Sequence, residues 1–524
     1  MEEVAKQDGS QVIHLPIREL NHGFWQDLPD SLLLFIFGFL TPKEVLTAGE
    51  VCRKWYRASM DEVLWKSIFI KSYNLSGIEK SQLQLPSSST LWIKEFERLY
   101  CETPLIEAQV LNEHTDEVLH VAFSHNGKMF ASSSKDCHAI LWDVTGDSVI
   151  LRERLVFKQY GWEYVQFCEF NSDDTLLLVS GVNEMRRLNF MGEIIICDLE
   201  GAALGNIVHA VISEPYDVFG AWLTDRTFIC GSFEFMVPSY DSSVSELWAN
   251  CVGGNQPVNL CRIVNESGSS VRTVLVARPN FLAEDEVFII FTHGVVTYTP
   301  HQVVIKKLKL NHKPSGELEV IESCRVKDQR SERRQPTENI SQSEVRSDSE
   351  GEFEELSYTK PDHLINTNSH IIGMNLSPDH DLLYVNCRLW TNADKIAANK
   401  EALPEISNDI HLRVYSLSTC QLVREHVGHR ASTPNDKCFF IFLNIAEKLV
   451  ASGAEDSCAH VWDRHFGVKL ATLTGHQNVV NCVAFNPRDP DMLVSASDDH
   501  TLRVWKSRRR SGKAVVRKDA VGCL

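Results

Sequence analysis

A histidine, a serine and an aspartate recur together three times along this chain, and these are the residue types of a hydrolytic triad. In each copy the serine lies four residues before the aspartate, and a tryptophan follows the aspartate by six residues. An enzyme does not need three copies of one triad, and a constant tryptophan has no part in that chemistry. The pattern therefore predicts a structural repeat. The three sets are His114, Ser132, Asp136 and Trp142; His429, Ser452, Asp456 and Trp462; and His476, Ser495, Asp499 and Trp505.

Other signatures of catalysis are missing from the sequence. It has no G-x-S-x-G elbow, phosphate-binding loop, kinase motif, H-E-x-x-H pair or dinucleotide fingerprint. We therefore expect no catalytic residue, no cofactor and no metal site, and a protein that is not an enzyme.

The elements that must position the repeated residues are short strands. The register of the three copies resembles the WD repeat, in which the four residues form a hydrogen-bonded tetrad inside a four-stranded blade of a β-propeller. Four more blades with weaker signals are expected between the first copy and the second. Their strands are predicted within 164–199, 218–248, 271–308 and 371–417.

The predicted fold is thus a multidomain chain, a small all-α domain followed by an all-β propeller over 104–506. Seven blades are expected, or eight if the insertion at 310–363 contains a strand. The last blade lacks a fourth strand after Trp505, so we expect Leu105–Leu111 to complete it and close the ring.

Two segments differ from the propeller in composition. Residues 310–363 run from basic to acidic and serine-rich with few apolar residues, which predicts a disordered insertion. The basic segment 507–524 predicts a solubilising tail, with nuclear import or anion binding as alternatives.

The N-terminal part follows a helical period. After a flexible N-terminus at 1–23, a helix is expected to open at Leu28-Pro29, and Thr41-Pro42-Lys43-Glu44 has the form of a capping box that starts a second helix. Further short helices are expected up to residue 70, and a linker and one more helix at 71–103.

Composition limits the classes of partner. The 524 residues carry a net charge of −18, which argues against nucleic acid or a membrane surface as a partner. The longest apolar run, Leu32–Leu40, is shorter than the ~18–20 residues of a membrane span, and the N-terminus does not read as a secretory signal. The fifteen cysteines form no C-x-x-C pair, which predicts reduced core residues and a cytoplasmic location, with a nuclear one as an alternative.

Residues 24–70 resemble the F-box in the Leu28-Pro29 start, the apolar first and second helices and the Cys52-Arg53-x-Trp55 segment. Together with the WD repeats and the stretches 214–220, 271–276, 370–374 and 434–442, this identifies the chain as a member of the F-box/WD-repeat substrate receptors. The insertion at 310–363 matches least.

This resemblance implies a non-catalytic substrate-recognition subunit of an SCF-type cullin–RING ubiquitin ligase, in a pathway that leads to proteasomal degradation. The alternative is a WD-repeat scaffold outside any ligase. The residues that the resemblance implies for docking on a Skp-family adaptor, itself bound to a cullin, are Leu28, Pro29, Leu32, Leu33, Ile36, Phe37, Leu40, Val45, Leu46, Val51, Cys52 and Trp55.

Protein substrates are expected at one face of the propeller. Relatives that read phosphorylated segments place arginine before the blade aspartate, but this chain has Lys135, Glu455 and Asp498 there, so a multi-arginine phosphate pocket is not expected. The candidate substrate-binding residues are Lys135, Arg272, Arg430, Glu455, Asn478 and Asp498. A second adaptor site, for the damage-binding adaptor of cullin-4 ligases, is suggested by Trp462, Asp463 and Arg464, with the arginine one position early for that motif.

Overall fold

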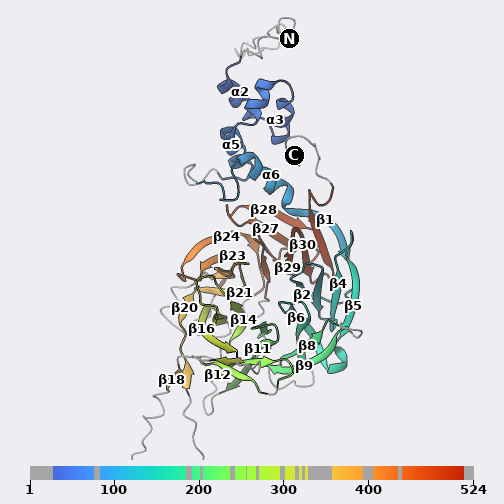
Figure 1. The fold of residues 1–524 in the computed structure, drawn as a ribbon, viewed down its shortest axis with the longest axis vertical. Helices are drawn as coiled ribbons and strands as arrows, with labels where there is room; N and C mark the ends of the chain where they lie inside the picture. The colour runs from blue at the N-terminus through green and yellow to red at the C-terminus, as the bar shows by residue number, and fades with distance from the viewer. Residues whose placement is uncertain are drawn as a thin grey trace, which may run out of the picture. The chain divides into compact units, whose positions relative to one another are not determined.

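The computed structural model describes residues 28–75, 83–183, 192–200, 204–216, 218–235, 242–254, 256–266, 271–294, 301–312, 318–320, 325–327, 357–392, 405–434 and 440–512. It divides close to residue 98 into a helical unit and a strand-rich unit (Figure 1). The predicted flexible N-terminus, 1–23, lies outside the described residues, as does the tail after residue 512.

Capping residues set the ends of the helices in the helical unit. Thr41 Oγ1 accepts the Glu44 N–H at 3.4 Å and the Glu44 carboxylate accepts the Thr41 N–H at 2.8 Å, which confirms the capping box. Asp61 caps the helix that follows it in the same way. Pro29 stands at the N-cap, one residue before the position that we predicted. The described helices are α2 (Asp30–Phe37), α3 (Pro42–Gly49), α4 (Arg53–Ser59), α5 (Glu62–Ser72) and α6 (Trp92–Glu102), of which α6 runs on past residue 98.

A close approach of α3 and α4 organises the packing of this unit. A Cβ at Gly49 would lie 2.4 Å from Ser59 Oγ, so only glycine allows the two helices to come this near. The Ser59 carbonyl in turn accepts a hydrogen bond from the indole of Trp65, at 2.7 Å, which ties α5 to α4. Phe69 and Trp92 pack edge to face, with ring centroids 5.2 Å apart, and join α6 to α5.

Seven antiparallel sheets form the blades of a propeller, which confirms the predicted fold (Figure 1). Strands such as β30 are buried on both faces because each sheet packs between two others. Blades 1 to 3 contain β2 (Val118–Phe123), β3 (Met129–Ser134), β4 (His138–Asp143) and β5 (Ile150–Val156); β6 (Trp162–Phe170), β7 (Leu176–Asn183), β8 (Gly192–Asp198) and β9 (Asn206–Ser213); and β10 (Ala221–Trp222), β11 (Thr227–Phe235), β12 (Ser242–Cys251) and β13 (Val258–Glu266).

Blades 4 to 7 follow the same pattern, with the first strand of each blade innermost. They contain β14 (Arg272–Ala277), β15 (Glu286–His293), β16 (Gln302–His312) and β20 (His363–Asn366); β21 (Ser369–Leu376), β22 (Leu382–Trp390), β23 (Ile406–Ser416) and β24 (Leu422–Arg430); β25 (Leu443–Ile445), β26 (Leu449–Ser452), β27 (Cys458–Asp463) and β28 (Lys469–Thr474); and β29 (Val480–Asn486), β30 (Asp489–Ser497), β31 (Leu502–Ser507) and β1 (Pro104–Leu111).

The ring closes as the sequence predicted. Strand β1 pairs antiparallel with β31, from Pro104 opposite Ser507 to Leu111 opposite Leu502. An ion pair between Glu107 and Arg503 joins the same two strands. The strand that precedes the first repeat therefore covers the edge that blade 7 would otherwise expose.

The insertion completes blade 4, and the eight-blade alternative is wrong. The eleven residues of β16 pair with β20 near one end and with β17 (Leu318–Val320) at the other. A short pair of strands, β18 (Arg325–Lys327) and β19 (Ser357–Thr359), lies deeper in the insertion. The prediction of disorder over the whole of 310–363 was thus too wide, and residues 328–356 lie outside the described residues.

A belt of contacts joins every blade to the next at the end of the ring where the first and second strands of each blade turn. These turns are short and their polar groups reach the neighbouring turn, so the ring is tied without a covalent link. From blade 7 round to blade 7 the contacts are Arg488 Nε to His125 O (3.0 Å), Asn126 N to Asp174 (2.8 Å), Asn171 Nδ2 to Asp225 O (2.9 Å), Arg278 Nη2 to Leu223 O (2.6 Å), Arg278 N to His380 Nδ1 (2.9 Å), Arg464 Nη2 to Asp379 (3.1 Å) and Phe485 N to Asn444 Oδ1 (3.0 Å).

The first residues of the basic tail are part of the propeller. The Arg508 guanidinium lies over the ring of Tyr100, 4.0 Å from its centroid, and Arg509 pairs with Asp491 and Glu102 at 2.9 Å each. The prediction of a solvated tail that starts at 507 is therefore wrong for residues 507–512, because acidic and aromatic side chains of the second unit hold them.

Candidate interaction surfaces

Blades 1 and 7 form the predicted tetrad. In blade 1 the His114 ring lies 2.8 Å from both the Asp136 carboxylate and Ser132 Oγ, and the Trp142 indole donates to Ser132 Oγ at 2.9 Å. Since the carboxylate accepts the proton on Nδ1, Nε2 is left to accept from the serine. The corresponding distances in blade 7 are 2.9, 2.8 and 2.9 Å, for His476, Asp499, Ser495 and Trp505.

The tetrad is a structural device because its members are buried and mutually satisfied. Ser132 and Ser495 are fully buried, so neither hydroxyl can reach a substrate. Burial alone would raise the pKa of Asp136, but the hydrogen bonds from His114 and from two backbone amides outweigh it and hold this pKa well below the usual range. Asp499 is lowered in the same way, through His476 and Thr501.

Blade 6 does not form the tetrad, which corrects our prediction for His429, Ser452, Asp456 and Trp462. Asp456 pairs instead with His460, at 3.0 Å, and the Trp462 indole donates to the Val427 carbonyl at 3.3 Å. Neither ring nitrogen of His429 has a hydrogen-bond partner among the described residues. Burial, with the neighbouring charge of His460 as a second cause, lowers the pKa of His429 well below its usual value.

A single residue explains the difference. His460 lies four residues after Asp456, at the position that Ile140 takes in blade 1 and Arg503 in blade 7. Its imidazole is within reach of the carboxylate, so it replaces His429 as the partner.

Helix α2 is apolar on two faces. Leu33 and Phe37 point into the helical unit and are at most 1% exposed. Leu32, Phe35, Ile36 and Phe39 recur at the spacing of one helical face, and Phe35 and Phe39 are 66% and 74% exposed. A helix that is apolar all round is normally buried, so the outer face lacks a partner in the described structure.

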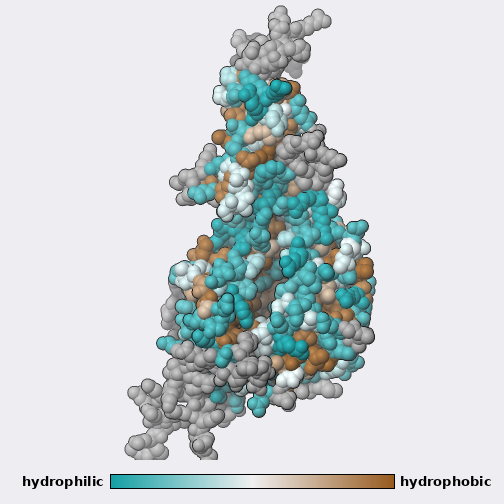
Figure 2. All heavy atoms as spheres, viewed as in Figure 1, coloured by the Kyte–Doolittle hydropathy of each residue, from teal (hydrophilic) through white to brown (hydrophobic). Residues whose placement is uncertain are grey.

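The predicted adaptor-docking residues fall into two groups. Pro29, Leu32, Ile36 and Val51 are exposed, whereas Leu28, Leu40, Leu46, Cys52 and Trp55 are half-buried. Leu33, Phe37 and Val45 are buried and can only support the helices that carry the others. Sequence reasoning missed the exposed Phe35, Phe39, Tyr56 and Val63; the i, i+3, i+4, i+7 spacing of 32, 35, 36 and 39 was the signal for the first two. Figure 2 shows hydrophobic residues at the surface of this unit.

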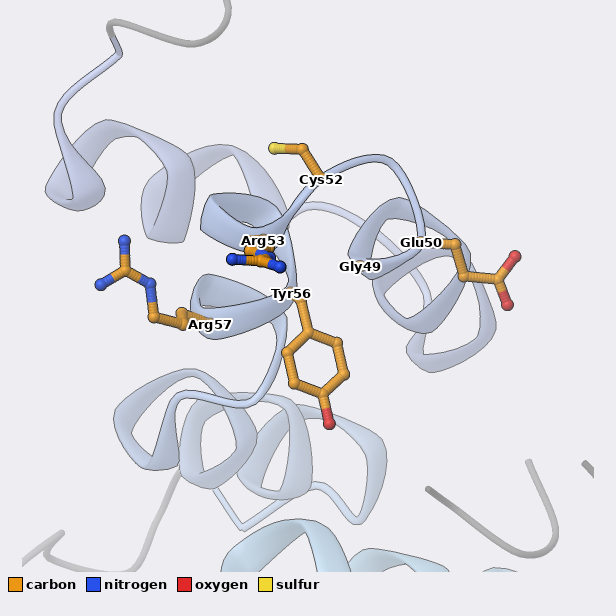
Figure 3. A pocket seen from close by; sticks show the side chains of 6 residues that line it. All are labelled: Gly49, Glu50, Cys52, Arg53, Tyr56 and Arg57. Carbon is orange, nitrogen blue, oxygen red and sulfur yellow. The ribbon is translucent and has the colours of Figure 1, made fainter. Parts of the chain in front are cut away.

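A shallow hollow of about 570 Å³ lies beside these residues on the helical unit (Figure 3). Figure 3 shows Arg53, Tyr56 and Arg57 along α4, with Glu50 and Cys52 in the segment before it. The predicted docking residue Cys52 thus borders a surface with two arginines, which adds polar contacts to an otherwise apolar face.

The predicted substrate-binding residues lie in turns at the end of the propeller opposite the belt, or at the start of the strand that follows such a turn. Lys135 pairs with Glu117, and Arg430 pairs with Asp409 at 3.1 Å. The Glu455 carboxylate accepts the backbone amides of Ser432 and Thr433, at 2.6 and 2.7 Å.

The remaining three differ in their surroundings. Burial raises the pKa of Asp498, which accepts a hydrogen bond from Asn481 at 2.5 Å. Asn478 is exposed, and Arg272 begins β14, the first strand of blade 4. Nothing in this arrangement gathers arginines around one point.

The predicted second adaptor motif is largely internal. Trp462 and Asp463 are at most 1% exposed. Arg464 contacts Asp379, the Tyr384 hydroxyl at 3.2 Å and the Glu447 carbonyl at 3.2 Å, so it is the belt contact between blades 5 and 6.

Metal ligands and membrane spans were also searched. Within the described ranges, His, Cys, Asp and Glu form no group of three that could hold a metal ion. None of the helices in that part of the chain is long and apolar enough to cross a membrane.

Comparison with known proteins agrees with this division of the chain. The F-box-like family model matches residues 25–71, and the model of the WD domain, G-beta repeat, matches 106–143 and 467–506. F-box/WD repeat-containing protein 5 of Homo sapiens is 34% identical over 576 residues, which cover 92% of this chain and 94% of the relative; its Mus musculus counterpart is 34% identical with the same coverage. A WD repeat-containing protein WDS homolog of Arabidopsis thaliana is 25% identical over 77% of this chain and 58% of its own length.

Proposed function

This chain belongs to the F-box/WD repeat-containing protein 5 family, and from that premise we propose that it is the substrate-recognition subunit of an SCF-type cullin–RING ubiquitin ligase. Its helical unit binds a Skp-family adaptor, and its propeller binds the protein to be ubiquitinated. The chain supplies no catalytic group. It holds the lysines of its substrate near a ubiquitin-charged enzyme, so the gain in rate comes from proximity.

The outer face of α2 carries this proposal. Leu32, Phe35 and Phe39 expose large apolar surfaces on a unit of fewer than 50 described residues before the linker. A unit of this size is marginally stable on its own and gains most from a partner that covers such a face. Aromatic side chains at the centre of an interface usually carry much of the binding free energy.

The double substitution Leu32→Glu and Phe35→Glu tests the proposal. Co-purification of the full chain with a Skp-family adaptor should fall at least tenfold, because two carboxylates would be buried without partners at the interface. The melting temperature should stay within a few degrees of the wild type, since both side chains already face solvent. The matched control is Val423→Glu, the same type of change at a 58% exposed position of β24. Unchanged adaptor binding by the folded double variant would refute the proposal and favour the scaffold alternative.

The second proposed adaptor, of cullin-4 ligases, has the weaker support. It rests on the Trp462-Asp463-Arg464 resemblance, whereas the contacts of Arg464 support a structural role. Arg464→Ala should therefore lower the melting temperature, because it removes the belt contact between blades 5 and 6. Loss of the damage-binding adaptor from a variant of unchanged stability would instead support a docking role.

A further inference from the structure

Five aromatic side chains, the channel cluster, meet at the centre of the propeller. They are His120 on β2, Phe167 on β6, Phe219 just before β10, and Phe440 and Phe442 just before β25. Their ring centroids lie 4.4 Å apart for His120 and Phe442, 5.8 Å for Phe219 and Phe442, and 4.7 Å for Phe440 and Phe442. Blades 3 and 6 are not neighbours in the ring, so the contact between Phe219 and Phe442 crosses the central channel.

This cluster is only partly covered. Phe167, Phe440 and Phe442 are half-buried, so part of each ring still faces open space. A core cluster would bury these rings fully, as the propeller does with Phe130 and Phe228. The channel therefore holds an aromatic surface that a side chain from outside can contact.

Carboxylates border this aromatic surface. The Phe442 N–H donates to the Asn481 carbonyl at 2.8 Å, and the Asn481 side chain donates to Asp498 at 2.5 Å, which places Asp498 two hydrogen bonds from the cluster. Burial raises the pKa of Asp498 and the neighbouring charge of Glu117 raises it further, so these two carboxylates lie close together.

The cations nearby are already neutralised. In the described turns of blades 6, 7 and 1 the carboxylates outside the tetrads are those of Asp116, Glu117, Glu455, Asp456 and Asp498, which we call the acidic rim. Against these five stand Lys135, paired with Glu117, and Arg430, paired with Asp409. The backbone amides of Ser432 and Thr433, which would suit an anion, are occupied by Glu455.

We propose that the channel mouth binds a lysine or arginine side chain of the substrate, with the cation against the channel cluster and opposite Asp498 and Glu117. This proposal rests on the proposed function and adds the class of segment that the propeller recognises. Aromatic faces attract a cation, and a low-dielectric mouth strengthens its attraction to the carboxylates. The same rim repels a phosphate, so a basic, unphosphorylated segment is the complementary partner.

Peptide binding to the full chain tests the charge requirement. Four fluorescein-labelled peptides share one Gly-Ser sequence and carry three arginines, three citrullines, three glutamates or three phosphoserines at the same positions. Fluorescence anisotropy should show the arginine peptide binding at least tenfold more tightly than the citrulline peptide, which has the same shape without the charge. Equal affinity for both, tighter binding of the glutamate or phosphoserine peptide, or no binding by the folded chain would overturn the proposal.

Two variants locate the site. Asp498→Asn with Glu117→Gln keeps hydrogen-bonding groups in place and should weaken the arginine peptide at least tenfold; Phe442→Leu should weaken it as well. The control Glu447→Gln removes the same charge from an exposed turn at the other end of blade 6 and should have no effect. Arginine binding that survives the double carboxylate variant would contradict the assignment. Adaptor co-purification from the same samples separates the two proposals, because it depends on the helical unit and should not change.

Discussion

Blade 1 and blade 6 carry the same four tetrad letters at the same relative spacing from serine to tryptophan, yet only blade 1 assembles them. In blade 1, Asp136 is the acceptor for His114 and for the amides of Thr115 and His138. In blade 6, Asp456 is 32% exposed and is held by His460. A motif therefore states which residues are available, and a competing neighbour decides which of them pair.

The match of the WD-domain model follows the same line. It covers 106–143 and 467–506, which contain the blades with assembled tetrads, and passes over the part of blade 6 that contains His429, Asp456 and His460. The comparison between the blades can be tested by removing, titrating and restoring the contacts of these residues.

The largest difference is expected when the aspartate is removed. Asp136→Ala should lower the free energy of unfolding by about 3 kcal/mol, because a buried histidine and two amides lose their acceptor. Asp456→Ala should cost about 1 kcal/mol, through the loss of one partner of the buried His460 rather than of His429. Urea-unfolding midpoints of the full chain provide the measurement. Equal losses in the two variants would show that Asp456 has the same role as Asp136.

Much of the fold could be predicted because the signals were local. The capping box at Thr41, the three tetrad registers and the unpaired strand at Leu105–Leu111 each require only nearby residues or a count of strands, and the structure agrees with them. The insertion could not be resolved in this way, because β20 completes blade 4 through contacts with β16 that are more than 50 residues away in sequence.

The candidate sites were less predictable for a related reason. Spacing identified α2 as apolar, but which of its residues face inward depends on Val45, Trp55 and the close approach at Gly49. The channel cluster comes from blades that are distant in sequence, and no single repeat contains its pattern. Likewise, nothing in the letters of blade 6 ranks His460 above His429 as the partner of Asp456.

Acid should affect the two blades in opposite ways as far as the histidines are concerned. His429 has a depressed pKa in the folded chain and about 6.5 when unfolded, so the unfolded state binds more protons below that pH. Stability should therefore fall by up to about 1.4 kcal/mol per pH unit for this residue as the pH decreases from 6.5. His429→Leu should remove that contribution, measured as a smaller change in urea midpoint between pH 7 and pH 5. His120 and His426, with pKa values of about 3 and about 4, contribute in the same direction and provide the residual slope.

The tetrad aspartates respond at lower pH. The folded-state pKa values of Asp136 and Asp499 lie below the unfolded value of about 4, so their stabilisation is present above pH 4 and is lost as the pH falls further. A midpoint that is unchanged between pH 7 and pH 5 in the wild-type chain would contradict the role given to His429.

The smallest effect is expected from restoring the missing tetrad. His460→Ile places in blade 6 the residue that blade 1 has at Ile140, which is fully buried there as His460 is nearly so. Without the competing imidazole, Asp456 and Ser452 become available to His429, and one or two new hydrogen bonds should raise the free energy of unfolding by about 1 kcal/mol. The gain should disappear when Asp456→Ala is also present, because the acceptor is then gone; this double-mutant cycle separates a restored tetrad from better packing of isoleucine. If the increase persists without Asp456, the absence of the tetrad has a cause other than His460, and the turn that carries His429 would be the next place to look for it.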